Sequence, residues 1–185
     1  PFLGMRLNKI ILVVGRKATG KTTFCKQLLN IDKKKSIIVD SFDHPSYREY
    51  KSIDVTQINR WKSGRVRVYT SPPLESLNVI FNRCNTCTVV LEDAKRYIKP
   101  NVQDIITKAI IEHRNRDIDI IFMFHQLSDV PPYICDNHNS LVLFKTNDTM
   151  DVRLTKFSNW NIIKEAHERI MKNSNPFYNE TITLQ

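Results

Sequence analysis

The residues with the clearest chemistry are 15–22, which read Gly-Arg-Lys-Ala-Thr-Gly-Lys-Thr. This order matches a phosphate-binding pattern of Gly, any four residues, Gly, Lys, and then Ser or Thr. The two glycines allow a tight backbone turn, so that successive N–H groups point toward phosphate oxygens. Lys21 would add a positive charge at the outer phosphates, and the Thr22 hydroxyl would bind Mg²⁺. This segment, called the P-loop below, predicts a site for a nucleoside triphosphate.

The sequence around the P-loop supports this prediction. The apolar run Lys9–Val14 precedes it and is typical of a buried strand, and residues 22–29 have a helical pattern. A helix that begins at the loop favours an anion at its N-terminus. The chain has four glycines, and two of them are at the motif positions, which argues against a chance match. The residues expected to contact the nucleotide are Gly15, Arg16, Lys17, Ala18, Thr19, Gly20, Lys21, Thr22 and Thr23.

A second polar feature is the acid pair Glu92-Asp93, which ends the apolar run that begins at Thr88. Nucleotide hydrolysis needs one acid to hold the Mg²⁺ shell and another to orient or deprotonate the attacking water. At the C-terminal end of a buried strand, both acids would reach the ligand-binding edge of the sheet. We expect Glu92 to contact Mg²⁺ together with Thr22, and Asp93 to be the general base. The reverse assignment stays open, because the Asp93 side chain is shorter.

The next apolar run, Ile118–Phe124, ends in His125-Gln126 and provides a third candidate. A polar side chain there can reach the γ-phosphate or the attacking water. Gln126 is the better candidate for this sensor role, because its amide both donates and accepts hydrogen bonds. His125 is expected to have a packing role, with catalysis as the alternative.

The turn between these two strands, residues 112–117, carries Arg114 and Arg116. It follows a helical stretch and precedes a strand, and we expect one arginine to project from the nucleotide edge of the domain. In a ring of identical subunits, such an arginine can reach the γ-phosphate bound by the neighbour. Arg114 is the candidate for this role, Arg116 is the second choice, and a solvated basic turn is the alternative.

The elements that must position these residues follow from the alternation of short apolar runs and helical stretches. This alternation is typical of a mostly parallel sheet with helices on both faces. The expected strands are 9–14, 36–40, 65–69, 88–92, 118–125 and 140–145. The expected helices are 22–29, 74–83, 102–113, 150–156 and 159–172, and residues 177–184 are expected to add an edge strand or lie loose. We therefore predict an α/β fold with one domain over residues 5–185, and residues 1–4 as a tag remnant.

The 185 residues include 28 Lys and Arg against 19 Asp and Glu, for a net charge of +9. This excess favours polyanionic partners, with nucleic acid first. The loops expected to contact DNA phosphates are Arg60–Arg67 and Lys95–Lys99, whereas Lys33–Lys35 is expected to be a solvated turn. No run has the roughly 18 apolar residues of a membrane span. No signal peptide is recognised, and a cytoplasmic location is expected.

The four cysteines, Cys25, Cys84, Cys87 and Cys135, are expected to be reduced thiols. Cys84 and Cys87 are closely spaced, but a zinc site needs a second pair of ligands at a comparable spacing. Metal or redox use is the alternative.

Taken together, these motifs resemble the HerA–FtsK superfamily of DNA-pumping ATPases. The resemblance rests on the P-loop, the strand that ends in the acid pair and Ala94, the arginine-bearing turn, and the strand that ends at Gln126. Within that superfamily, the chain is similar to genome-packaging ATPases of membrane-containing viruses and to Zot-like ATPases of filamentous phages. The resemblance spans roughly residues 8–146. The chain departs from the pattern in its Glu-Asp order and in the register of Arg114, which differs by one position.

The resemblance implies a RecA-like P-loop NTPase fold and ATP hydrolysis with Mg²⁺, coupled to DNA translocation in a ring of about five or six subunits. It implies that Lys21 and Thr22 bind phosphate and metal, and that the acid pair contacts Mg²⁺ and water. It also implies Gln126 as the sensor and Arg114 as the arginine that acts across subunits. DNA would be bound without sequence preference, with capsid or membrane-vertex proteins as further partners. The expected location is the host cytoplasm or the virion.

Two other classes of function share part of this pattern. A small nucleotide kinase also has an N-terminal P-loop, but it closes an arginine-rich lid over its acceptor, and no such lid is evident in the sequence. The acids at a strand end instead favour water as the nucleophile. An ATP-gated clamp or assembly factor would carry every motif, and it would differ from a motor in turnover alone.

Overall fold

The computed structural model describes residues 9–40, 42–69, 73–98, 102–150 and 154–183. Its described strands form one eight-stranded sheet in the order β3-β4-β2-β5-β6-β1-β7-β8. The strands are β1 (Ile10–Val14), β2 (Lys35–Asp40), β3 (Lys51–Ser52), β4 (Arg65–Tyr69), β5 (Cys87–Leu91), β6 (Ile118–Phe124), β7 (Ser140–Leu143) and β8 (Glu180–Thr183). Neighbouring strands are parallel except β7 and β8, which are antiparallel. Strand β1 leads into the P-loop, and β5 leads into the acid pair. Only β6 lies between these two strands in the sheet.

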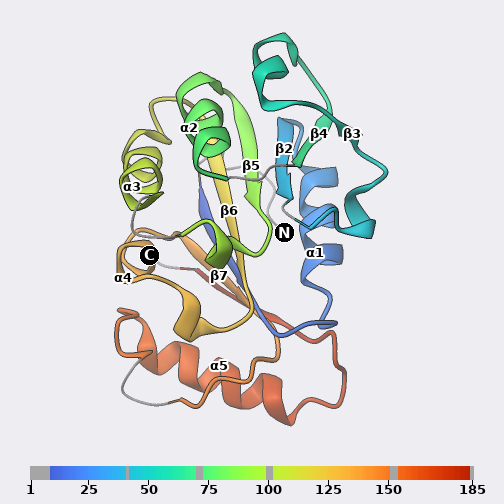
Figure 1. The fold of residues 1–185 in the computed structure, drawn as a ribbon. Coiled ribbons are helices and arrows are strands. Elements are labelled where there is room, and N and C mark those ends of the chain that lie inside the picture. The colour runs from blue at the N-terminus through green and yellow to red at the C-terminus, as the bar shows by residue number, and fades with distance from the viewer. Residues whose placement is uncertain (1–8, 41, 70–72, 99–101, 151–153, 184–185) are drawn as a thin grey trace.

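Helices lie on both faces of this sheet (Figure 1). They are α1 (Lys21–Ile31), α2 (Pro73–Arg83), α3 (Gln103–Glu112), α4 (Pro132–Cys135) and α5 (Trp160–Lys172). The buried side chains of α1 pack in one cluster with alternate residues of β1, β2, β5, β6 and β7. Those of the other four helices pack in a second cluster, against the opposite face. The α/β class with a mostly parallel sheet and helices on both faces is thus confirmed.

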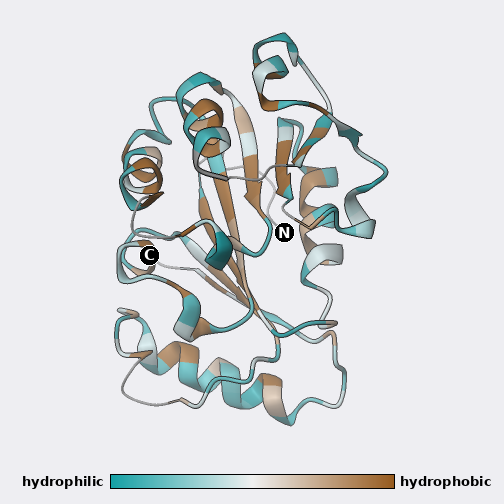
Figure 2. Cartoon of the chain, viewed as in Figure 1, coloured by the Kyte–Doolittle hydropathy of each residue, from teal (hydrophilic) through white to brown (hydrophobic). Residues whose placement is uncertain are grey.

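The two clusters explain why the central strands are continuous apolar runs rather than alternating ones. In β1, Val13 faces α1, whereas Leu12 and Val14 face the other helices, and all three are fully buried. A parallel sheet that is covered on both faces requires an apolar residue at every position. Figure 2 shows this apolar character along the central strands.

The six expected strands are all present, with ends that agree to within two residues. The tail adds the edge strand β8, the first of the two expected alternatives. Sequence patterns missed β3 and the short helices at Pro45–Tyr47 and Val55–Arg60, because a two-residue strand and helices of one or two turns are too short to show an apolar period. The expected helix at 150–156 falls partly on residues 151–153, outside the described residues. Leu154 has a 3₁₀-helical conformation, and residues 155–156 form a turn.

Two further features bear on the sequence expectations. The cysteines Cys25, Cys84, Cys87 and Cys135 are buried and free. Within the described ranges, no helix is both long enough and apolar enough to cross a membrane.

Candidate nucleotide site

The P-loop is anchored to the ends of two strands that flank β1. The Gly15 amide donates to the Phe124 carbonyl at the end of β6 (3.1 Å), and the Arg16 amide donates to the Lys145 carbonyl just after β7 (2.8 Å). Gly15 has no room for a side chain, because a Cβ there would lie 2.5 Å from the Cβ of Phe144. The first glycine of the motif is therefore required by close packing against the residue that follows β7.

The rest of the loop wraps around the N-terminal end of α1. Ala18 and Gly20 both have positive φ, at 61° and 94°, and α1 begins directly afterwards at Lys21. The first amides of a helix have no partners within it, so a loop that wraps around a helix N-terminus can present them to an anion. The loop therefore has the turn and the helix start that are typical of phosphate-binding loops.

Lys21 is held inside this wrap, with 7% of its surface exposed. Its Nζ donates to the carbonyls of Gly15 (2.5 Å) and Arg16 (2.9 Å). Burial lowers the pKa of Lys21 to about 8, and the carboxylates of Glu92 and Asp93 oppose this shift. The ammonium group is charged at pH 7 and largely desolvated, which strengthens its attraction for a bound phosphate.

The acid pair lies across from Lys21, and its two members have different surroundings. Glu92 is 8% exposed, and its Oε2 accepts a hydrogen bond from the Tyr47 hydroxyl (2.7 Å). Burial raises the pKa of Glu92, while the hydrogen bond from Tyr47 and the charge of Lys21 lower it. Asp93 is more open, with 19% of its side chain exposed, and has a left-handed backbone with φ of 50°. Aspartate adopts this conformation more readily than most residues other than glycine.

Tyr47 was not a candidate from the sequence. It is fully buried and comes from the short helix Pro45–Tyr47, which follows β2. The Asp40 carboxylate at the end of β2 accepts hydrogen bonds from the amides of Phe42 and His44, and so shapes the turn before this helix. The Asp-Ser-Phe-Asp-His-Pro sequence signals a turn, but no local pattern shows that the next tyrosine reaches β5.

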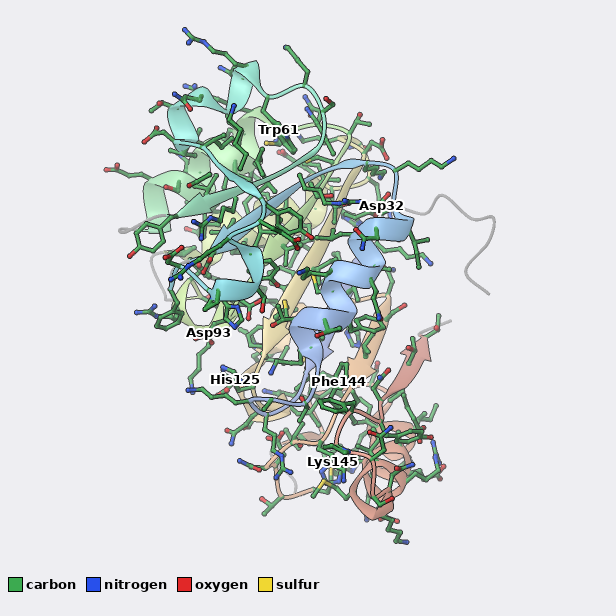
Figure 3. All side chains as sticks on the ribbon, turned by 90° about the vertical axis from the view of Figure 1, so that its right-hand side faces the viewer. Asp32, Trp61, Asp93, His125, Phe144 and Lys145 are labelled. Atoms are coloured by element: carbon green, nitrogen blue, oxygen red, sulfur yellow. The ribbon has the colours of Figure 1, made fainter. Side chains whose placement is uncertain are left out.

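His125 occupies the position between the P-loop and the acid pair. Its Nδ1 lies 3.4 Å from the Lys21 Nζ, and its Nε2 lies 3.9 Å from the Asp93 Oδ1. Burial, followed by the charge of Lys21, lowers the pKa of His125. A neutral ring that accepts from Lys21 at Nδ1 carries its proton at Nε2, on the side of Asp93. Figure 3 shows Asp93, His125 and Phe144 around the N-terminal end of α1.

His125, for which we expected a packing role, therefore lies beside the P-loop and Asp93. The Gly15 amide bonds to Phe124, so the first residue after β6 is the one beside the P-loop. Gln126 comes one position later, and its Oε1 accepts a hydrogen bond from the Ser128 hydroxyl (3.4 Å). The sensor role that we expected of Gln126 remains a prediction, and His125 is the nearer candidate for it.

The donor set fits Mg²⁺ held jointly by protein and nucleotide. Among the described residues, no group of three His, Cys, Asp or Glu side chains could hold a metal ion. Mg²⁺ in nucleotide sites is typically bound by one or two protein oxygens, phosphate oxygens and water. Thr22, in the first turn of α1, and Glu92 are the residues that would hold the ion, which would neutralise charge on the outer phosphates.

The two arginines of the turn before β6 lie at the opposite edge of the sheet. Because β1 and β6 are parallel, the turn before Ile118 is at the edge where the strands begin, whereas the P-loop follows their ends. The expectation that an arginine projects from the nucleotide edge is therefore wrong. Arg116 is also engaged within the fold, since its guanidinium donates to Cys84 O (2.8 Å), Asn85 Oδ1 (3.0 Å) and Phe81 O. Arg114 is exposed.

The contrast between the two acids leads to a prediction. Asp93→Asn should leave Mg-ATP binding intact and lower turnover by about 100-fold or more, because the open carboxylate is the one that water can reach. Glu92→Gln should instead raise the Mg²⁺ concentration that half-maximal activity requires. Phosphate release measured against Mg²⁺ concentration separates the two effects. If Glu92→Gln loses only turnover and Asp93→Asn changes the Mg²⁺ dependence, the two roles are reversed.

The fold resembles that of solved structures of viral packaging NTPases. The genome packaging NTPase B204 from Sulfolobus turreted icosahedral virus 2, in complex with sulfate, is 18% identical, with a TM-score of 0.74 over 97% of this chain and 92% of that chain. Its complex with ATP-gammaS gives 18% identity and a TM-score of 0.71 over 95% and 92%. B204, the DNA-packaging ATPase from Sulfolobus Turreted Icosahedral Virus, gives 19% identity and a TM-score of 0.73 over 97% and 94%.

No protein-family model and no curated protein matches the chain. The resemblance to packaging ATPases that the motifs suggested is thus confirmed for the fold, across nearly the whole chain.

Proposed function

We propose that this chain is an ATP-hydrolysing DNA translocase that acts in a ring, as a subunit of a viral genome-packaging motor. One observation carries the proposal: Lys21, His125 and Asp93 meet at the end of β1 and β6, around a P-loop. This arrangement provides a cation for the phosphates and an open carboxylate for the attacking water. The packaging NTPases with the same fold, one of them solved with an ATP analogue, support the assignment of substrate and process.

A translocating motor must grip the DNA backbone through phosphates, because it has to process any sequence. Basic residues that already have partners within the fold are less available to contact DNA phosphates. In the loop Arg60–Arg67, the Arg65 guanidinium donates to Leu29 O (2.7 Å), and Arg67 pairs with Asp40 (3.6 Å) and with Asp43. These two arginines hold the fold together and are poor candidates for DNA contact.

Two basic residues of the second loop expected to contact DNA, Lys95–Lys99, also have partners within the fold. Lys95 pairs with Asp129 (2.6 Å), and the Arg96 guanidinium lies 3.7 Å from the centre of the Phe42 ring. Lys99 lies outside the described residues. This loop is therefore a weaker candidate for DNA contact than the sequence suggested.

Better candidates for DNA contact lie at the edge of the sheet where the parallel strands begin. Lys33 and Lys62 are exposed, and with Lys34 and Lys35 they line one hollow of about 970 Å³ beside α1. Lys34 pairs with Asp117 (2.8 Å), and Lys35 lies over the Trp61 ring at 4.7 Å. Lys33–Lys35 is thus only partly the solvated turn that we expected. Lys33 and Lys62 are the cations that we assign to the DNA backbone.

The proposal predicts an ATPase that double-stranded DNA stimulates and that salt inhibits, because phosphate contacts release counterions. Replacing both Lys33 and Lys62 with Ala should reduce the stimulation several-fold and flatten its salt dependence. Lys164→Ala, which removes an exposed lysine on α5, is the matched control and should keep the full stimulation. The measurement is phosphate release with and without DNA, with native mass spectrometry in the presence of an ATP analogue to detect the ring.

The other two functions predict different results in the same assay. A nucleotide kinase would convert ATP only after addition of a nucleoside monophosphate, and would release little phosphate. A clamp would bind DNA when ATP is present, without turnover. Either result, or a wild-type ATPase that ignores DNA, contradicts the proposed motor.

A further inference from the structure

An exposed aromatic side chain lies against the P-loop and takes no part in the site described above. Phe177 comes from the turn before β8 and has 60% of its surface exposed. A Cβ added to Gly20 would lie 3.4 Å from the Phe177 Cδ1 and 3.9 Å from its Cβ. The ring is therefore in contact range of the last glycine of the P-loop, and a large part of its surface faces solvent. Water is an unfavourable environment for that apolar surface.

The turn that carries Phe177 is well ordered by hydrogen bonds. The Phe177 amide donates to the Asn175 Oδ1 (2.9 Å), and the Asn175 amide donates to the Asn173 Oδ1 (2.9 Å). The Lys145 Nζ donates to the Asn173 carbonyl (2.5 Å), while the carbonyl of the same lysine accepts from the Arg16 amide in the P-loop (2.8 Å). Lys145 thus links the two segments, and the position of the Phe177 ring is set relative to the P-loop.

The order of the strands fixes the direction in which a bound nucleotide must run. The acid pair and His125 follow β5 and β6, on one side of β1, so the γ-phosphate must point to that side. The sugar and base must then leave the P-loop on the other side of β1, toward β7 and β8. Phe177 lies on that side, directly before β8. In Figure 3, Phe144 and Lys145, which follow β7, lie below the N-terminal end of α1, across from Asp93.

We propose that Phe177 is the stacking platform for the base of the bound nucleoside triphosphate. This inference rests on the proposed nucleotide function and adds a subsite to it. A flat aromatic ring binds a base through its face, and the larger ring system of a purine covers more of it. Such a contact recognises purine nucleotides as a class, without selecting adenine from guanine by hydrogen bonds.

The test compares Mg-ATP with inorganic tripolyphosphate, which has the phosphates but no base. Phe177→Ala should weaken Mg-ATP binding about 10-fold in calorimetry, in keeping with typical base–aromatic stacking. Its affinity for tripolyphosphate should stay at the wild-type value. Phe177→Leu, which keeps apolar bulk without the ring face, should behave like Phe177→Ala, and Phe177→Trp should restore Mg-ATP binding. Tyr69→Ala, at an equally exposed aromatic residue on β4 (57%), is the control and should change neither affinity.

Failure of this inference is distinct from failure of the proposed function. Equal losses for Mg-ATP and tripolyphosphate would show that Phe177 supports the P-loop rather than the base, and unchanged affinity for both would remove any role. Either result overturns the stacking proposal while the nucleotide site stands. A wild-type protein that binds neither ligand would instead overturn the proposed function itself. Thermal unfolding of each variant shows that the fold is intact.

Discussion

Lys21→Ala should abolish ATP hydrolysis and weaken Mg-ATP binding. The ammonium of Lys21 lies within hydrogen-bonding distance of the Gly15 and Arg16 carbonyls, inside the wrap where the β- and γ-phosphates would bind. Its removal takes away the buried charge that stabilises both the bound nucleotide and the transition state. Phosphate release and calorimetry measure the two effects separately.

Lys26→Ala is the matched control for this variant. It removes a lysine from the same helix, and its ion pair with Glu49 is on the surface, where such pairs contribute little to stability. Its hydrolysis rate should equal that of the wild type. Hydrolysis by Lys21→Ala at near the wild-type rate would exclude nucleotide hydrolysis at this site, and with it the proposed motor.

Arg114→Ala should bind Mg-ATP normally but lose about 1,000-fold or more in hydrolysis, if Arg114 acts on the γ-phosphate of a neighbouring subunit. Ring interfaces are head-to-tail, so they join different surfaces of two copies. The P-loop lies where the parallel strands end, and Arg114 lies where they begin. A ring in which the Arg114 turn of one copy faces the P-loop of the next copy would bring the two together, although they are far apart within one chain.

Mixing two inactive variants tests this arrangement. Lys21→Ala keeps Arg114 but cannot hydrolyse ATP at its own P-loop. Arg114→Ala binds ATP but lacks the arginine that would act on the neighbouring subunit. A mixed ring would place some intact P-loops beside intact arginines, and part of the activity should return. If the mixture stays inactive while native mass spectrometry shows mixed rings, Arg114 does not act across subunits.

Arg116 is a poor substitute for that role. Its guanidinium donates to three acceptors at the C-terminal end of α2 and in the turn that follows it, including Phe81 O and Cys84 O. Loss of these hydrogen bonds, two of which are partly buried, destabilises the turn itself. A defect in Arg116→Ala should therefore appear in thermal unfolding, and it should not be rescued by mixing.

Much of the fold was predictable because its signals are local. A strand buried on both faces, such as Ile118–Phe124, is apolar at every position, and the P-loop motif needs no distant partner to be recognised. The positions of Glu92 and Asp93 at the end of a strand follow from the same reasoning. These features determined the α/β class and the location of the candidate nucleotide site from the sequence by itself.

The identities of the groups that meet at the site depended on contacts between distant segments. The bond between Gly15 and Phe124 sets the register of β6, and a shift of one residue would have exchanged His125 with Gln126. The hydrogen bond from Tyr47 to Glu92 spans 45 positions, and the approach of Phe177 to Gly20 joins the tail to the P-loop. Residue types and spacing do not reveal such pairings, because the pairings form only when separate strands and turns pack together. The tertiary structure therefore decided which side chains lie around the P-loop, and that Arg114 lies at the opposite edge of the sheet.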